Sequence, residues 1–356
     1  MEVWPVFRFN HFMRYFVIII LVLVFFAGSL ALAEEKRVEK DLDDDGKIDQ
    51  IACFDAGGKI TRLEIDGNRD GIMDRFQFYE HETPVRIERD TDFDRQIDCL
   101  DYFEKGKRVR QERISGSQNV YQITCFDKNE TPLLMKKDSN LDGKFDVFTM
   151  FKNGTLFSQE KDTNFDDKID LKVFYKNGSK EKLVKDADHD QYFETTQWFN
   201  RPNWTRVMEQ DSDKNGNPEA RFYYKDGVLR LKEIDEDQDN RPELREHYNK
   251  KGKLFKSEED EGNTGRLNMA WFYDDSEKAI RAEMDGDGDG RADVWYFYTQ
   301  GRLLAVEEDT NKDGKPDLWE AYDESEALIK RQKDLDFDGK PDVEKSAGES
   351  GASEKM

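Results

Sequence analysis

The chain has 356 residues, of which 79 are acidic and 56 are basic, giving a formal net charge of −23. Aromatic residues make up 12% of it, with 25 Phe and 13 Tyr. Disordered acidic chains contain few aromatics, so a folded protein is expected, and phosphate backbones would repel so acidic a chain, which excludes nucleic acid as a partner.

The first 33 residues carry the features of an export signal. Arg8 and Arg14 precede an apolar run from Tyr15 to Ala33, which ends in an Ala-Leu-Ala sequence typical of a cleavage site. We expect cleavage after Ala33 and an exported protein that is periplasmic, secreted or at the cell surface, with no membrane contact afterwards. The apolar run is also long enough to remain as an uncleaved anchor.

From Asp41 onward the sequence is a tandem repeat of 24 or 25 residues. Each copy begins with an acidic nonapeptide of the pattern D-x-[DN]-x-D-G-x-x-D or a variant of it. Twelve copies start at Asp41, Asp66, Asp90, Asp138, Asp162, Asp186, Asp211, Asp235, Asp260, Asp285, Asp309 and Asp334. A thirteenth, decayed copy near Ile114 fills the one gap of double length. We expect an unbroken array over residues 34–343 and a disordered polar tail at 344–356.

The remainder of each unit predicts two short strands joined by a tight turn. A segment rich in aromatic and β-branched residues follows each acidic loop, and such residues favour strands. The turns Asn153-Gly154, Asn177-Gly178 and Asp226-Gly227 are typical of two-residue type I′ hairpins, because both central residues need a positive φ. Helices are excluded because these turns interrupt every amphipathic run.

The fold class is therefore all-β, with about thirteen strand–turn–strand units joined by acidic loops. We expect an elongated antiparallel meander or solenoid in which each unit contacts only its neighbours. The alternative is a β-propeller, which needs two units per blade, although the unit lengths do not alternate.

The three cysteines are expected to be small buried residues in strands, although an oxidising compartment would permit one disulfide. In an open array Cys99 and Cys125 lie two strands apart, too far to form that bridge. A bridge between them would therefore argue against the array.

The acidic nonapeptide has the composition of a calcium loop. Ca²⁺ binds six to eight oxygens, and carboxylates at alternate positions of a tight loop can direct several oxygens at one centre. Gly at position six permits the sharp turn, and position seven supplies a carbonyl oxygen, so its side chain is free to vary. The alternative is that Asp and Gly only form polar turns.

This spacing resembles the first nine residues of an EF-hand loop, and also the calcium loops of dockerins, thrombospondin type 3 repeats and integrin FG-GAP repeats. The resemblance covers the loops alone and no family covers the whole chain. It implies several bound Ca²⁺ ions. The bidentate Glu that an EF-hand carries at position twelve is generally absent, since that position holds Ala52, Gln77 or Thr149, for example.

Six loops have oxygen ligands at positions one, three, five and nine and Gly at six. Their predicted metal ligands are Asp41, Asp43, Asp45 and Asp49; Asp66, Asn68, Asp70 and Asp74; Asp138, Asn140, Asp142 and Asp146; Asp285, Asp287, Asp289 and Asp293; Asp309, Asn311, Asp313 and Asp317; and Asp334, Asp336, Asp338 and Asp342. The loop at Asp211 keeps its Gly but has Asn215 and Glu219, and the loops at Asp90, Asp162, Asp186 and Asp235 keep four oxygen ligands without the Gly.

The sequence shows no catalytic motif, because no group of residues assembles a nucleophile, a base and an orienting partner. An enzyme is therefore not expected. Trp198, Trp271, Trp295 and Trp319 lie in first strands. We expect these aromatics to form the core, with both sheet faces covered. The alternative is an exposed aromatic stripe that binds a glycan or peptide.

These patterns predict an exported calcium-binding repeat protein that serves as a structural, adhesive or interaction scaffold for an unidentified protein or glycan partner. The alternative is a calcium-dependent glycan or peptide binder that uses the strand aromatics.

Overall fold

The computed structural model describes residues 36–116 and 119–346. In these residues the chain forms 26 strands and no helix, so no helix there could cross a membrane. The predicted export signal at 1–33 lies outside the described residues. The last strand ends at Ser346, beyond the expected array boundary, and the rest of the predicted tail, 347–356, also lies outside them.

All strands belong to one antiparallel sheet in which each strand pairs with its neighbours in sequence, from β1–β2 to β25–β26. The strands are β1 (Lys36–Lys40), β2 (Gln50–Phe54), β3 (Ile60–Ile65), β4 (Arg75–Glu80), β5 (Thr83–Arg89), β6 (Cys99–Glu104), β7 (Lys107–Ile114), β8 (Val120–Phe126), β9 (Pro132–Lys137), β10 (Val147–Lys152), β11 (Thr155–Lys161), β12 (Leu171–Lys176), β13 (Ser179–Lys185), β14 (Thr195–Arg201), β15 (Trp204–Gln210), β16 (Ala220–Lys225), β17 (Val228–Ile234), β18 (Leu244–Tyr248), β19 (Leu254–Glu259), β20 (Met269–Tyr273), β21 (Ala279–Met284), β22 (Val294–Thr299), β23 (Arg302–Glu308), β24 (Leu318–Tyr322), β25 (Leu328–Lys333) and β26 (Val343–Ser346).

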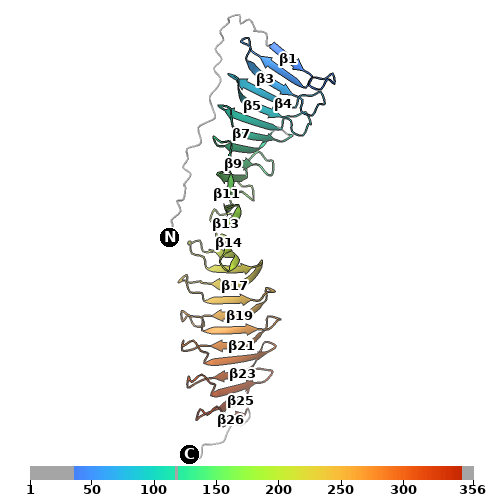
Figure 1. Ribbon diagram of the computed structural model, residues 1–356. Coiled ribbons are helices and arrows are strands. Elements are labelled where there is room, and N and C mark those ends of the chain that lie inside the picture. The colour runs from blue at the N-terminus through green and yellow to red at the C-terminus, as the bar shows by residue number, and fades with distance from the viewer. Residues whose placement is uncertain (1–35, 117–118, 347–356) are drawn as a thin grey trace, which may run out of the picture.

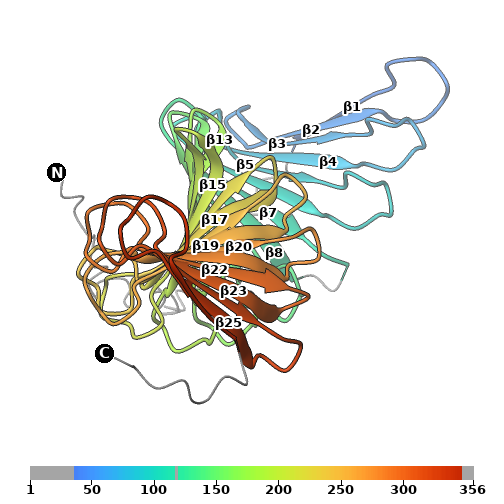
Figure 2. The same cartoon turned by 90° about the horizontal axis from the view of Figure 1, so that it is seen from below.

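The sheet is an open meander, as the repeat predicts. Figure 1 shows the strands stacked crosswise along the length of the molecule, with β1 and β26 at opposite ends. Contacts between strands join only sequence neighbours, so no second layer formed by the described residues packs on the sheet. The alternative of a β-propeller is therefore wrong. Figure 2 shows the strands fanned about the long axis, which is the twist expected of neighbouring strands.

The two kinds of connection lie on opposite long edges of the sheet, because successive strands run antiparallel. The tight turns have the predicted geometry: φ is 51° at Asn153 and 73° at Gly154, and 53° at Asp226 and 79° at Gly227. Both residues of each pair are left-handed, as a type I′ turn requires. We call the other edge, which carries the acidic loops, the acidic edge. The decayed repeat copy connects β7 to β8 there.

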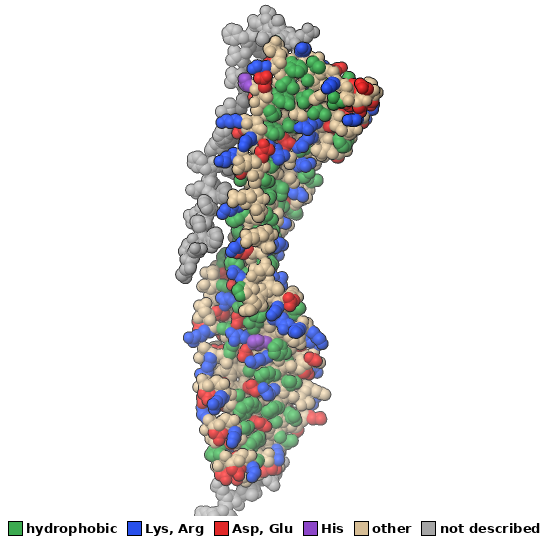
Figure 3. Space-filling model, viewed as in Figure 1, with side chains coloured by type: hydrophobic (Ala, Val, Ile, Leu, Met, Phe, Trp, Pro, Cys, Tyr) green, Lys and Arg blue, Asp and Glu red, His purple; other side chains and the backbone are tan. Residues whose placement is uncertain are grey.

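The expectation of an aromatic core covered on both faces is wrong. The buried apolar residues among those described are only Ile51, Cys53, Cys99, Val173, Val207 and Ala282. The four strand tryptophans are half-buried. A single layer covers its side chains only with their neighbours on the same face, so a large ring keeps an exposed surface. Figure 3 shows hydrophobic side chains reaching the surface between charged ones along the molecule.

On one face, long basic side chains partly replace the missing layer. The guanidinium carbon of Arg86 lies 4.4 Å from the centre of the Phe78 ring, and that of Arg281 lies 4.6 Å from the Phe272 ring. The same arginine, Arg86, pairs with Glu88 at 3.0 Å. The aliphatic stems cover apolar surface while the charged ends remain in water.

None of the three cysteines, all within the described residues, is in a disulfide, and the geometry excludes a bridge between Cys99 and Cys125. Cys99 pairs with Arg113 and Cys125 with Arg110 on the intervening strand β7. Arg110 and Arg113 are an odd number of residues apart, so their side chains, and those of the two cysteines, point to opposite faces of the sheet.

Candidate functional site: the acidic edge

Every one of the twelve acidic loops has the same backbone conformation. Positions four and six are left-handed throughout, with φ of 62° at Leu141 and 94° at Gly143, for example. Loops without Gly at position six adopt it as well: φ is 76° at Arg95, 82° at Gln191 and 70° at Asn240. Loss of the Gly therefore strains a loop without changing its shape.

The carboxylate at position one holds this conformation. In the loop at Asp138, the amide of Leu141 donates to Asp138 Oδ1 at 2.7 Å and the amide of Gly143 donates to Oδ2 at 2.8 Å. At position nine, Asp146 Oδ2 accepts the amide of Ser139 at 2.7 Å, which closes the loop. Amides that have no strand partner are thus satisfied by side chains, as in an N-cap.

The side chains at positions three and five differ from those at positions one and nine in their hydrogen bonds and in their exposure. Asp142 Oδ1 accepts the amide of Lys144 at 2.8 Å, and Asp336 Oδ1 accepts the amide of Asp338 at 3.2 Å. In all six predicted loops these positions are exposed. By contrast, the buried predicted ligands all occupy positions one or nine: Asp49, Asp66, Asp138, Asp146, Asp309, Asp317 and Asp334. Five of the six predicted loops therefore have a buried floor at position one or nine and exposed outer carboxylates, whereas in the loop at Asp285 both of these positions are half-buried.

The loop itself holds two of the carboxylates at position one, Asp334 and Asp211, in the charged form. Burial acts to raise the pKa of Asp334, but hydrogen bonds from the amides of Gly339 and Phe337 outweigh it, and the pKa lies below its ordinary value. The pKa of Asp211 is lowered in the same sense: burial opposes the shift, and the Tyr192 hydroxyl and the Gly216 amide produce it. Hydrogen bonds to a carboxylate favour its ionised state.

At position three of the loop at Asp334, the pKa of the Asp336 carboxyl group is raised instead of lowered. The amide of Asp338 lowers the pKa of Asp336, but the charge of Asp342, burial and the charges of Asp338 and Asp334 together outweigh it, so the pKa is raised. Such crowding of like charges favours a bound proton or cation.

The structure brings carboxylate oxygens together in several loops. Among the predicted ligands, Asp41, Asp43 and Asp45 each place an oxygen within 4.8 Å of the others. Similar groups occur in loops outside the predicted set: Asp90, Asp92 and Asp94; Asp186, Asp188 and Glu194; Asp211, Asp213 and Glu219. All these ligands are oxygens, which hard divalent cations such as Ca²⁺ prefer.

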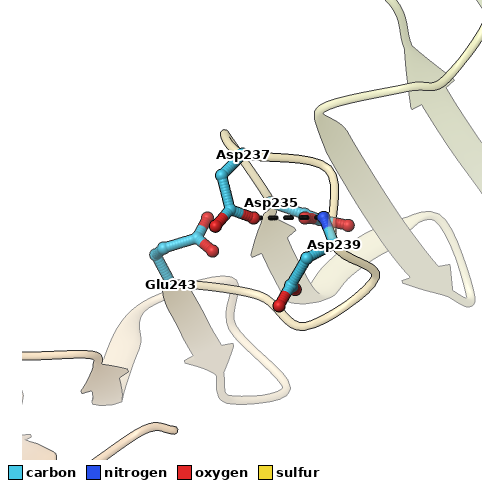
Figure 4. A group of neighbouring side chains, drawn as sticks. All are labelled: Asp235, Asp237, Asp239 and Glu243. Carbon is cyan, nitrogen blue, oxygen red and sulfur yellow. Dashed lines mark hydrogen bonds between the residues drawn. The ribbon is translucent and has the colours of Figure 1, made fainter. Parts of the chain in front are cut away.

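A four-carboxylate group lies in the loop between β17 and β18, where Asp235, Asp237, Asp239 and Glu243 have oxygens within 4.8 Å of one another. Figure 4 shows this group, with the carboxylates of Asp237 and Glu243 turned toward each other. The sequence analysis recognised its four oxygen ligands but left it out of the six predicted loops, because position six is Asn240 instead of Gly. The signal for this group is the four acids at positions one, three, five and nine.

Neighbouring loops are linked along the acidic edge by ion pairs. A basic residue at position four reaches back to position three of the preceding loop: Arg69 Nη1 lies 2.9 Å from Asp43 Oδ2, and Lys312 Nζ lies 2.6 Å from Asp287 Oδ2. Lys214 Nζ contacts Asp188 at 2.8 Å and also Asp190. These lysines and arginines partly compensate the loop charge, and they do so unequally from loop to loop.

No protein-family model and no curated protein matches the chain. Among solved structures, it is similar to the crystal structure of TcdB2-TccC3-TEV, with 14% identity over 80% of this chain and 15% of that chain and a TM-score of 0.20. It is also similar to TcdB2-TccC3 without its hypervariable C-terminal region, with 14% identity over 82% of this chain and a TM-score of 0.21. The chain thus spans about 15% of the length of these structures.

The shared loop conformation predicts the cost of adding a side chain at position six. We expect Gly143→Ala to lower the free energy of unfolding by about 1 kcal/mol, because φ there is left-handed. A Cβ at Gly143 would have no atom within 4 Å, so the substitution measures only the cost of the left-handed backbone conformation. Urea unfolding provides the measurement. Gly116→Ala is the control, since Gly116 has open space and no positive φ; equal stability of the two variants would contradict the prediction.

The lowered pKa values predict that acid destabilises the acidic edge. A carboxyl group whose pKa is lower in the folded state stabilises the fold above its unfolded pKa, near 3.8 for Asp334. That contribution is lost as the pH falls through the folded pKa. We expect the free energy of unfolding to fall between pH 5 and about pH 3. Asp334→Asn should reduce this dependence, whereas Asp275→Asn, at an exposed turn, should not; an unchanged pH profile in Asp334→Asn would refute the assignment.

Proposed function

We propose that the protein is an exported calcium-binding repeat protein whose acidic loops hold Ca²⁺ and whose sheet serves as a structural, adhesive or interaction scaffold. The observation that carries the proposal is the repetition of one loop geometry along the acidic edge, with carboxylate oxygens converging in several copies. The expected role is binding rather than catalysis, and the partner is an unidentified protein or glycan.

If the loops only formed turns, some of their carboxylate oxygens would have no role. At position one both oxygens accept amides, as in Asp309, which receives Lys312 N at 2.7 Å on Oδ1 and Gly314 N at 2.6 Å on Oδ2. Within the described residues, Asp336 and Asp338 use only Oδ1 for main-chain amides. Their Oδ2 atoms are therefore available to a cation, together with the carbonyl at position seven.

The architecture also supports a stabilising role for cations. A single-layer sheet with so few buried apolar residues gains little from hydrophobic burial. The same sheet stacks carboxylates at intervals of one repeat along one edge, where they repel each other. A divalent ion bound in each loop would relieve this repulsion and fasten the ends of two strands.

The central test is thermal unfolding with and without Ca²⁺. A ligand that binds only the folded state stabilises it by mass action, by about 2.7 kcal/mol per site when its concentration is 100 times the dissociation constant. Dissociation constants of about 10⁻⁴–10⁻³ M are typical of extracellular calcium modules. We therefore expect a large rise in melting temperature in ~10 mM CaCl₂ relative to a chelator.

Two comparisons separate specific binding from screening. NaCl at the same ionic strength should give a much smaller rise, because salt only screens exposed charges. The double variant Asp336→Asn/Asp338→Asn should lose part of the calcium effect, whereas Glu324→Gln, an exposed acid outside the acidic loops, should keep it. Identical melting with Ca²⁺ and with chelator would refute the proposal.

A second candidate function is calcium-dependent binding of a glycan or peptide through the strand aromatics. The supporting observation is that no second layer covers the sheet, so Trp271, Trp295 and Trp319 keep exposed surface. Trp271 also lies 5.7 Å from Tyr298, centroid to centroid, across neighbouring units. Trp295 and Trp319 both pair with Glu307 and lie on one face of the sheet, whereas Trp271 lies on the opposite face. Half-exposed aromatic rings on either face are a suitable surface for sugar rings or extended peptides.

This second function predicts binding on a glycan array in the presence of Ca²⁺, and its loss in Trp295→Ala and in Trp319→Ala. Tyr79→Ala serves as the control, because Tyr79 is a half-buried aromatic residue in the distant strand β4. No binding by the intact protein would favour a purely structural scaffold, as would binding that survives both tryptophan substitutions.

A further inference from the structure

Asp235 is a buried carboxylate whose Oδ1 has no hydrogen-bond partner. Its exposed fraction is 3%, and Oδ1 accepts no hydrogen bond. The equivalent Asp138, at 2% exposure, accepts loop amides through both oxygens. Among the described residues, the ion-pair partner of Asp235 is Arg221, whose Nη1 lies 3.7 Å from Oδ2, beyond hydrogen-bond distance. Leaving a buried carboxylate oxygen unpaired is costly.

The other three carboxylates of this loop are also incompletely used. Glu243 Oε2 accepts the amide of Glu236 at 2.6 Å, Asp237 Oδ1 accepts the amide of Asp239 at 3.1 Å, and Asp239 Oδ1 accepts the amide of Arg241 at 2.8 Å. Each therefore gives one oxygen to the main chain and retains a second. With Asp235 they bring four negative charges within 4.8 Å of one another.

Compensation by neighbouring cations is small at this loop. The residue at position four of the next loop is Asn263, which is neutral, whereas Arg69, Lys214 and Lys312 reach back to three other loops. Within the described residues, Asp237, Asp239 and Glu243 make no ion pair. A hollow of about 330 Å³, lined by these three acids, Asp260 and Arg241 among others, gives solvent access to the group.

Two neighbouring loops have a similar buried oxygen but more compensation. Asp211 Oδ1 is unpartnered, yet Asp211 Oδ2 accepts the Tyr192 hydroxyl, and Gln238 Nε2 donates to Asp213 at 3.0 Å. Glu194 Oε2 is unpartnered, but Lys214 neutralises the outer acids of that loop. The loop at Asp235 thus combines an unpaired buried oxygen with three further carboxylates that make no ion pair within the described residues.

We propose that Asp235, Asp237, Asp239 and Glu243 form the protein's tightest divalent-cation site, which fills before the loops that match the nonapeptide pattern. The inference rests on cation binding by the acidic loops and adds an order of filling. The loops at Asp41, Asp285 and Asp334 also supply four charged ligands, but Arg69 and Lys312 already contact the first two of these loops. The physical reason for the order is that a cation at Asp235 removes the cost of an unpaired buried oxygen without first displacing a lysine or arginine.

The test is calorimetric titration of the purified protein with Ca²⁺ alone. We expect a first, tighter step of one ion followed by weaker steps. Asp237→Asn/Asp239→Asn should weaken the first step by at least about tenfold and leave the weaker steps, because the charge of the ligand set is halved. Asn occupies position three or five in other loops of this chain, for example Asn140 and Asn215, so the variant preserves the turn.

Glu236→Gln is the matched control, since Glu236 is an exposed acid of the same loop that is not in the ligand group. If the double variant does not fold, Glu243→Gln provides the same comparison with a single change. A first step that is unaltered in the variants, or equal affinities for all sites, would overturn this inference while leaving calcium binding intact. No calcium binding at all by the intact protein would overturn the proposed function as well.

Discussion

The architecture depends on the carboxylate at position one of each acidic loop. This side chain accepts the amides of positions four and six, as Asp66 does from Arg69 at 2.7 Å and from Gly71 at 2.7 Å. It thereby holds two left-handed residues in a short span and returns the chain as the next antiparallel strand. Asp211 and Asp235 are exceptions, since their Oδ1 atoms accept no hydrogen bond. Because all twelve loops nevertheless share one backbone conformation, the register of the strands is set locally, one unit at a time, and needs no distant contact.

Local closure explains how a sheet of 26 strands exists without a second layer. Its strands contact only their sequence neighbours, and arginine and lysine side chains over aromatic rings supply part of the cover that another layer would give. The consequence is electrostatic. Among the described residues, buried carboxylates on one edge outnumber buried apolar side chains, so the stability of the array is tied to whatever neutralises that edge, whether lysines, protons or divalent cations.

Neutralisation is uneven, and this unevenness distinguishes loops that share one backbone. Where Lys214 or Lys312 reaches back, the preceding loop already has a cation within 3 Å of its acids. Where Asn263 stands in that place, Asp237, Asp239 and Glu243 of the preceding loop make no ion pair within the described residues. A match to the nonapeptide therefore predicts the shape of a loop, whereas the charge that remains uncompensated depends on residues contributed by the next unit.

The sequence by itself determined the repeat, the all-β class, the open array and the type I′ turns, because these follow from local patterns such as Asn153-Gly154 and from the 24- or 25-residue period. It also identified the loops, whose ligand spacing is a local property. Tertiary structure alone decided that the aromatics are half-buried, because alternation within a strand does not reveal whether a second layer exists. It alone showed that loops without Gly keep the same conformation, and that Asp235 lacks a partner for Oδ1, because both depend on how adjacent units stack.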